Sequence, residues 1–185
     1  MVETNIVAPR PVERITVLQG EALVSSSPTV EFTTVLGSCV STCLFDPAAQ
    51  TGGMNHFLLA EPPSGWAEGT VDEHYGVYLM ELLINEMMKR GATKSGMRAH
   101  LYGGANMHSG MLQIGTVNAA FARQFLVREG IPLVREDLGG CRARRIEFRP
   151  AVGQVRCRAV ENSIAPPPVA TPRAPNAFGE VELFN

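Results

Sequence analysis

The sequence has no apolar run that approaches the roughly 20 residues needed to cross a bilayer. Residues 1–14, MVETNIVAPRPVER, also lack the long apolar region of a secretory signal. Basic residues are not in excess, because 16 Lys and Arg against 18 Asp and Glu leave a net charge of −2. This balance excludes a strongly basic nucleic-acid binder at the level of the whole chain. We therefore expect a cytoplasmic protein with no membrane insertion.

The sequence also lacks any CxxC pair, although it contains four cysteines, at positions 39, 43, 141 and 157. Cys39 and Cys43 fall in a predicted strand, where four residues span about 13 Å, too far for both to bind one zinc ion. In a reducing compartment free thiols are the expected state, and one of them can be reactive. We therefore expect no metal.

What is present suits one folded domain, since 45% of the 185 residues are apolar. Residues 1–13 are predicted to be a loose N-terminal arm, 14–160 the folded domain, and 161–185 a proline-rich, disordered tail. The tail ends in the short acidic and apolar run 178–184. The interpretations of that run that stay open are a frayed terminus, a docking peptide for a partner, and a strand that pairs with an exposed edge.

Alternating apolar residues and turn signals predict more strands than helices, several of them joined as hairpins. This pattern favours an α+β fold of layered β-sheets with flanking helices over a doubly wound one. The predicted strands are 15–18, 22–24, 32–36, 40–45, 54–59, 98–102, 131–135, 144–148 and 154–160. Helices are predicted from Asp72 to about Arg90, with Gly91 as the residue after its end, and over about 117–129 with Gly130 closing it.

One cysteine and one histidine lie where adjacent strands would bring them together. Cys39 lies at the mouth of the predicted strand 40–45, and His56 lies on the next predicted strand. If the strands form a hairpin that turns at 46–49, facing residue numbers sum to about 95, which sets position 39 opposite position 56. A longer loop would shift the pairing by a few residues and keep the side chains neighbours. An imidazole beside a cysteine helps form the thiolate and protonates departing ammonia, so the pair predicts a cysteine amidohydrolase.

Two further elements of such a site are considered around the cysteine. Gly37 and Ser38 precede it, so the backbone amides of Ser38 and Cys39 are candidates for holding an oxyanion. A third group should accept a hydrogen bond from the second imidazole nitrogen. The candidates near enough in sequence are Thr33, Thr34, Ser38 and Asn55.

Structural interpretations compete with the catalytic one. A cysteine in a strand is commonly a small buried apolar residue, and Cys43, Cys141 and Cys157 are interpreted in that way. A histidine among Phe57, Leu58 and Leu59 is commonly a satisfied core residue. The rival bases are His74, His100 and His108, of which His100, in a predicted strand, is the best.

Several motifs, in one collinear order over about residues 14–160, resemble the CheD family of chemoreceptor glutamine deamidases of bacterial chemotaxis. The two that contain the cysteine and histidine are Phe32–Val40 (FTTVLGSCV) and Gly52–Phe57 (GGMNHF). Further matches are Tyr75–Gly76, Leu83–Asn85, Gly103–Met107, Ile114–Gly115, Asn118, Glu129–Ile131 and Glu136–Gly140. Cys141 departs from the pattern, because family members usually carry asparagine there.

The resemblance implies a fold similar to that of the cytotoxic necrotizing factor deamidases, and an enzyme without metal or organic cofactor. By position, Cys39 matches the family's nucleophile, His56 its general base, and Thr33 its third catalytic residue. The implied substrates are glutamines of methyl-accepting chemoreceptors, which become glutamates. A CheC-type chemotaxis phosphatase is a further partner that the resemblance implies for some members.

Arginines 142, 144, 145, 149, 156 and 158 gather in the C-terminal strands. They are interpreted either as a docking face for acidic receptor segments or as a solvated edge that discourages aggregation. Rival functions are hydrolysis of a glutamyl methyl ester, transglutamination, and a binding module that regulates a phosphatase or receptor array. A nucleic-acid module is disfavoured, because no base-stacking aromatic pattern accompanies the arginines.

Overall fold

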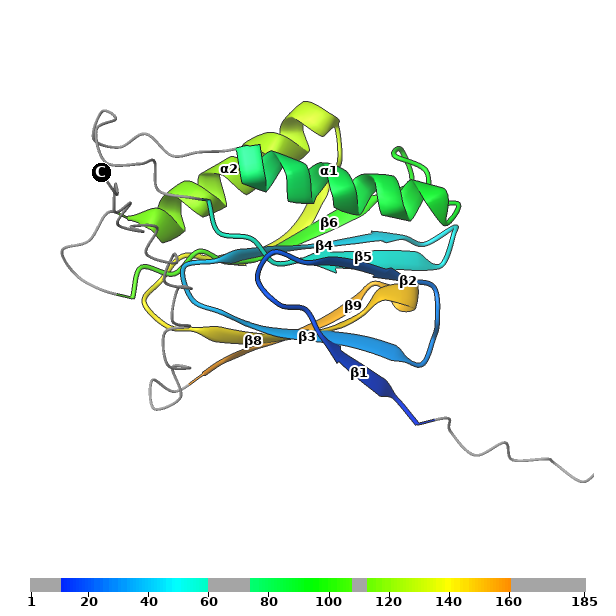
Figure 1. Ribbon diagram of the computed structural model, residues 1–185, viewed down its shortest axis with the longest axis horizontal. Helices are drawn as coiled ribbons and strands as arrows, with labels where there is room; N and C mark the ends of the chain where they lie inside the picture. The colour runs from blue at the N-terminus through cyan, green and yellow to red at the C-terminus, as the bar shows by residue number, and fades with distance from the viewer. Residues whose placement is uncertain (1–10, 60–73, 108–112, 161–185) are drawn as a thin grey trace, which may run out of the picture.

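The computed structural model describes residues 11–59, 74–107 and 113–160. Three layers are visible in Figure 1: two helices, a five-stranded sheet beneath them, and a four-stranded sheet beneath that. This confirms the predicted α+β class with layered sheets and flanking helices. The elements are β1 (Glu13–Thr16), β2 (Ala22–Ser25), β3 (Val30–Leu36), β4 (Val40–Asp46), β5 (Thr51–Asn55), α1 (His74–Lys89), β6 (Arg98–Gly103), α2 (Ile114–Glu129), β7 (Leu133–Leu138), β8 (Arg144–Arg149), a 3-10 turn (Pro150–Val152) and β9 (Gln154–Ala159).

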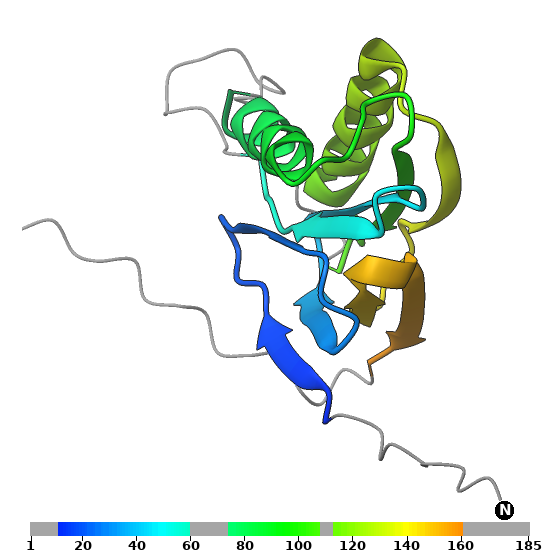
Figure 2. The ribbon, with the colours of Figure 1, turned by 90° about the vertical axis from the view of Figure 1, so that its right-hand side faces the viewer.

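Both sheets are mixed and are assembled from strands that lie far apart in the chain. The four-stranded sheet has the order β1-β3-β8-β9, and the five-stranded sheet has the order β2-β5-β4-β6-β7. β1 is parallel to β3, β7 is parallel to β6, and the other pairs are antiparallel. Figure 2 shows the sheets stacked face to face, with both helices on the far side of the five-stranded sheet.

Two apolar clusters fill the spaces between these layers. The first lies between the helices and the five-stranded sheet and includes Val40, Leu44 and Phe57. The second lies between the two sheets and includes Cys43 and Met54. Because side chains alternate along a strand, odd-numbered residues of β4 point into the space between the sheets. Cys39 extends this odd series, and it packs against the second cluster.

The hairpin of β4 and β5 has a different register from the predicted one. The paired residues are Asp46 and Thr51, then Leu44 and Gly53, and facing numbers sum to 97 instead of about 95. The Asp46 carboxylate explains the shift, because it accepts hydrogen bonds from the amides of Ala48 at 2.9 Å and Ala49 at 3.2 Å. Asp46 is therefore the last paired residue of β4 rather than the first residue of the turn.

Gly52 and Gly53 are strand residues, because β5 begins at Thr51, so the predicted start of that strand at Met54 is wrong. A Cβ at Gly52 would lie 2.4 Å from the carbonyl oxygen of Pro150. A Cβ at Gly53 would lie 2.6 Å from a methyl carbon of Leu83 on α1. The glycines allow β5 to pack closely between the helix and the turn before β9.

The helices agree with the prediction in type and differ at one end. α1 ends at Lys89, and Gly91 follows with a φ of +91°. Its predicted start at Asp72 lies outside the described residues. α2 begins at Ile114, three residues before the predicted start, and Gly130 closes it in the left-handed conformation. Neither described helix is long and apolar enough to cross a membrane.

Candidate active site

In the segment Gly37–Cys39, between β3 and β4, the carbonyl oxygen of each residue accepts a hydrogen bond. The amide of Ala105 donates to Gly37 O at 2.9 Å, and the amide of Gly104 donates to Cys39 O at 2.8 Å. The side-chain nitrogen of Asn118 donates to Ser38 O at 2.9 Å. With three consecutive carbonyls fixed, the backbone at the cysteine has one orientation.

The backbone amides of the same segment are hydrogen-bond donors beside the Cys39 sulfur. Within residues 11–59, 74–107 and 113–160, no group accepts a hydrogen bond from the amide of Ser38. The Cys39 amide lies close enough to its own sulfur to favour the thiolate. Two backbone donors beside a nucleophile are the arrangement that stabilises an oxyanion. Their use in catalysis stays a prediction.

Cys39 and His56 are diagonal neighbours on one face of the sheet. Val40 and Phe57 form a bridge in which each amide donates to the other's carbonyl at 2.9 Å. Cys39 and His56 each precede a member of that bridge, so both side chains point away from Val40 and Phe57, into the space between the sheets. Diagonal neighbours are roughly 7–8 Å apart between Cα atoms, within reach of an imidazole. The residue directly opposite His56 is Ser41, not Cys39 as the predicted register had it.

The hydrogen bonds around the His56 ring fix its tautomer. The Thr34 hydroxyl donates its single proton to Val17 O at 2.9 Å. His56 Nδ1 lies 3.0 Å from that hydroxyl oxygen and 3.3 Å from Val17 O, and both atoms are acceptors there. Nδ1 must therefore carry the proton, which leaves a lone pair on Nε2. Among the described residues, Nε2 is buried and has no hydrogen-bond partner.

The threonine that contacts the imidazole is Thr34, whereas the family match had indicated Thr33. In β3 the even-numbered Phe32, Thr34 and Leu36 are buried toward the five-stranded sheet. Thr33 points to the opposite face and pairs with Glu147 of β8. This alternation was present in the sequence and could have separated the two candidates.

Burial favours the neutral forms of the Cys39 thiol and the His56 imidazole. Desolvation raises the pKa of the Cys39 thiol to about 11, and the nearby Cys39 amide offsets only part of that rise. Desolvation also lowers the pKa of His56 from its ordinary value, with the Val17 carbonyl opposing the change. Both shifts favour the neutral forms, a thiol and a neutral imidazole, over a thiolate and an imidazolium.

The connection between β1 and β2 contacts both Cys39 and His56. This contact was not predicted from the sequence. The Cys39 sulfur lies 3.5 Å from the side-chain oxygen of Gln19. The amide of Gly20 donates to His56 O at 2.8 Å, and the amide of His56 donates to Glu21 O at 3.0 Å. No pattern in residues 17–21 indicates this contact, because it depends on β1 pairing with β3.

Asn118 is a second residue whose role was missed, although it was among the matched motif positions. It is fully buried in α2, beside Ala119 and one turn before Ala122. Its side-chain oxygen accepts from the amide of Leu59 at 3.0 Å while its nitrogen binds Ser38 O. One amide group thus joins the cysteine segment to the segment after His56. A polar residue on an otherwise apolar helix face was the available signal.

The rival residues lie elsewhere. His100 of β6 is directly opposite Cys43, and the position opposite Cys39 lies four residues further along, about 13 Å away. Asn55 faces the helix layer, where its oxygen accepts from the amide of Thr42 at 2.8 Å. His108 and the side chain of His74 lie outside the described residues. All four cysteines are unpaired.

In the described residues, no metal cluster coincides with this site, and the cavity beside β9 lies elsewhere. Over the described residues, no three His, Cys, Asp or Glu side chains gather as metal ligands would. A cavity of about 260 Å³ lies near the edge of β9, lined by residues that include Arg135, Glu147 and Cys157. It contains neither Cys39 nor His56.

The sequence comparisons agree on a family. The family model described as "CheD chemotactic sensory transduction" matches residues 58–159, a range that begins just after His56. A Zymomonas mobilis protein named "Probable chemoreceptor glutamine deamidase CheD" is 52% identical over 172 residues, covering 93% of each chain. Proteins with that name from Caulobacter vibrioides and Rhizobium meliloti are 46% and 48% identical, covering 92% and 77% of this chain.

Solved structures give a weaker match. A Neisseria meningitidis protein of the family DUF152 aligns with a TM-score of 0.45 at 14% identity, over 70% of this chain and 63% of its own. A Bacillus licheniformis hypothetical protein, YfiH, aligns with a TM-score of 0.42 at 15% identity, over 65% of this chain and 49% of its own. The sequence relatives and the family model carry the assignment, and by them this chain belongs to the CheD family.

Proposed function

We propose that this protein is a chemoreceptor glutamine deamidase, an amide hydrolase that converts glutamine side chains of methyl-accepting chemotaxis proteins to glutamate. The observation that carries the proposal is the ring of His56, which lies on the same face of the sheet as Cys39. Its Nδ1 contacts Thr34 and Val17 O, and among the described residues its buried Nε2 has no hydrogen-bond partner. The names of the relatives support the choice of substrate.

The proposed reaction starts from the neutral pair. Nε2 of His56 takes the thiol proton as the Cys39 sulfur bonds to the carboxamide carbon, and the carbonyl oxygen becomes an oxyanion near the Ser38 and Cys39 amides. The imidazolium then gives its proton to the nitrogen, the C–N bond breaks and ammonia leaves, which produces a thioester. Nε2 next takes a proton from water as the water oxygen attacks. The C–S bond breaks, the sulfur recovers its proton, and glutamate is released.

In this proposal the third residue is Thr34 rather than Thr33. The Thr34 hydroxyl oxygen accepts a hydrogen bond from Nδ1–H, and the hydroxyl itself donates to Val17 O. The Nδ1–H bond to Thr34 can therefore persist while Nε2 gains and loses its proton. Gln19 is the side chain that contacts the sulfur at rest, and an incoming carboxamide would take its place. Nothing in the mechanism needs a metal or an organic cofactor.

Mass spectrometry of receptor fragments tests the proposal directly. Fragments incubated with the parent protein should show the small mass gain of amide-to-acid conversion at specific glutamines, with equimolar ammonia release. Cys39→Ala should produce neither signal. Full conversion by Cys39→Ala, or none by the folded parent protein on any receptor, would reject the assignment.

We further propose that the outer face of the four-stranded sheet docks acidic receptor segments. The strand registers place five arginines and two glutamates on this face. Both glutamates are paired, Glu31 with Arg14 at 2.8 Å and Glu147 with Arg156 at 3.3 Å. No described helix covers the face (Figure 1). The arginines are Arg14, Arg145, Arg149, Arg156 and Arg158; Arg144 points inward and is not among them.

Salt and charge variants test this docking face. Added salt should raise KM for receptor fragments, because screening weakens exposed charge pairs, and should leave kcat unchanged. Replacing Arg156 and Arg158 by glutamine should raise KM and flatten its salt dependence. Arg90→Gln, on the helix side, is the matched control. A KM that is indifferent to salt would leave these arginines as a solvated edge.

We also propose a phosphatase partner and a relation of the fold to known deamidases. A CheC-type phosphatase would bind over Cys39 and His56, and it should then protect Cys39 from alkylation and inhibit deamidation competitively. The fold is proposed to be that of the cytotoxic necrotizing factor deamidases. Superposition that aligned Cys39 and His56 with the catalytic pair of such a toxin would support that relation.

A further inference from the structure

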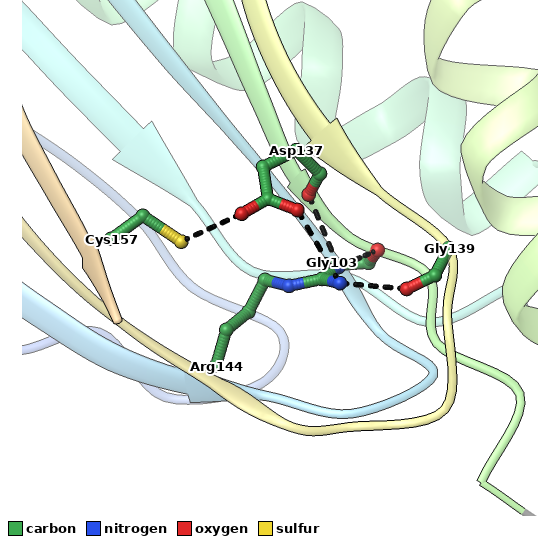
Figure 3. Close-up of polar contacts among 5 residues, drawn as sticks. All are labelled: Gly103, Asp137, Gly139, Arg144 and Cys157. Carbon is green, nitrogen blue, oxygen red and sulfur yellow. Dashed lines mark hydrogen bonds and ion pairs between the residues drawn. The ribbon is translucent and has the colours of Figure 1, made fainter. Parts of the chain in front are cut away.

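Arg144 is buried at the start of β8 and points between the two sheets. It shares this inner face with Ile146 and Phe148, and only 9% of the residue is exposed. A buried guanidinium must have its donors satisfied, because desolvating an unpaired charge is costly. Figure 3 shows where those donors go: the side chain reaches backbone carbonyls at the ends of β6 and β7 and in the loop after β7.

The hydrogen bonds of Arg144 join the end of β6 to the loop after β7. Nη1 donates to Gly103 O at 2.5 Å and to Asp137 O at 3.1 Å, and Nη2 donates to Gly139 O at 2.6 Å. The Asp137 carboxylate lies 3.4 Å from Nη2 and balances the charge. A rigid fork of N–H groups can bind three converging carbonyls at once, and a lysine ammonium cannot reproduce that geometry.

The segment that Arg144 holds is the one that holds the cysteine. Gly104 and Ala105 follow Gly103 directly, and their amides bind Cys39 O and Gly37 O. Gly103 itself has a φ of +108°, and a Cβ there would lie 2.1 Å from Cys39 O. The backbone of residue 103 is therefore in contact with the carbonyl of the nucleophile, and any shift of Gly103 moves Cys39.

We propose that Arg144 is a positioning residue for Cys39, acting through the backbone of residues 103–105. It touches neither the sulfur nor His56; it fixes the segment against which the cysteine carbonyl is hydrogen-bonded. This inference rests on the proposed role of Cys39 as nucleophile. Because rate depends steeply on the placement of the attacking atom, a displacement of about 1 Å costs roughly 100-fold.

The test measures kcat, KM and the rate of Cys39 alkylation in Arg144→Ala and Arg144→Lys. We expect kcat to fall about 100-fold in both, with KM within about threefold of the parent value, because binding groups are untouched. Millimolar guanidinium should restore a large part of kcat in Arg144→Ala, where it can refill the site. It should not restore kcat in Arg144→Lys, where the lysine side chain occupies that space.

Phe148→Leu is the matched control, since it also weakens the inner face of β8 but lies at the other end of the strand, opposite Phe32. It should lower the melting temperature and leave kcat close to the parent value. A folded Arg144→Lys with parental kcat would overturn the inference, and this variant decides alone if Arg144→Ala does not fold. If Cys39→Ala still deamidates, the proposed function fails; if Cys39→Ala is inactive and Arg144→Lys is fully active, only the positioning role fails.

Discussion

Two cysteine–histidine couples lie on the face of the five-stranded sheet that is turned toward the four-stranded sheet. They are Cys39 with His56 and Cys43 with His100, and they differ in burial, in relative position and in the contacts of the histidine ring. Cys43 is directly opposite His100, and it is fully buried. Cys39 is diagonal to His56 and half-buried at the start of the same strand. Judged by contact alone, the interior couple is the closer one. Of the two cysteines, only Cys39 is partly exposed.

The histidines of the two couples also differ in what their nitrogens do. His56 has its Nδ1 proton fixed by Thr34 and Val17, which leaves Nε2 as a base. Nδ1 of His100 lies 3.5 Å from the Tyr102 hydroxyl, and its ring packs edge-on against Phe45. The comparison teaches that two cysteine–histidine couples on one sheet can differ in access to the sulfur and in the hydrogen bonds of the ring, and the proposed mechanism depends on both properties.

The largest effect should come from exchanging the two sulfurs for hydroxyls. Cys39→Ser should lower deamidation by at least about 10³-fold, because an alcohol is a far weaker nucleophile than a thiol at this pH. Cys43→Ser should stay within about threefold in kcat and lower the melting temperature, because it buries a hydroxyl. Ammonia release and thermal unfolding measure the two outcomes. Equal activities would remove the distinction between the couples.

A smaller effect is expected at the histidines. His56→Gln should lower kcat by about 10²-fold to 10³-fold, the usual share of a general base. His100→Gln should leave kcat near the parent value, since that ring lies opposite Cys43. Single-turnover assays on a receptor fragment separate these outcomes. A large loss of kcat in a folded His100→Gln would assign the base to the interior couple.

The two adjacent threonines give the next test. Thr34→Val keeps the shape of the side chain and removes the acceptor for Nδ1, so kcat should fall about 10-fold to 30-fold. Thr33→Val lies on the other face of β3 and should change kcat by less than about twofold. The ratio of the two kcat values is the measurement. If Thr33→Val proves to be the damaging substitution, the position matched by family resemblance is the catalytic one.

The smallest effect concerns pH. Burial lowers the pKa of His56, so the imidazole stays in its neutral, basic form down to below its ordinary value of 6.5. Between about pH 6.5 and pH 8.5, kcat/KM should therefore change by less than about twofold, and it should fall as pH decreases further and His56 gains a proton. A bell-shaped profile centred near neutrality would instead indicate a thiolate–imidazolium pair as the active form.

Local patterns predicted the parts of this site that depend on neighbouring strands. The hairpin that brings Cys39 and His56 together was inferred from two strands and a turn, and it was wrong only by two residues in register. Thr34 was within reach of the same reasoning, since it shares a face with Phe32 and Leu36. The match by position indicates Thr33, and a motif match carries no information about which way a side chain points. Which threonine acts in catalysis stays a prediction.

The remaining parts depend on pairings between distant strands. Val17 and Gln19 reach the site because β1 lies parallel to β3, and nothing local in residues 11–21 indicates that partner. Arg144 was grouped with its arginine neighbours as a surface charge. Its inward orientation follows from β8 pairing with β3, which places it opposite Leu36 on the buried side. Such pairings are decided by how the whole chain packs, not by local propensity.

The Asp46 turn has a consequence for how this enzyme family can vary. Because its carboxylate ends the pairing of β4 at a fixed residue, the number of residues from 47 to 50 decides which side of the sheet each later residue occupies. Deleting or inserting one residue there would rotate His56 into the helix-side core and bring Phe57 to face the cysteine. Under the proposed mechanism, the length of a loop at the opposite end of the hairpin thus matters for hydrolysis as much as the imidazole does, and tolerated length changes should come in twos.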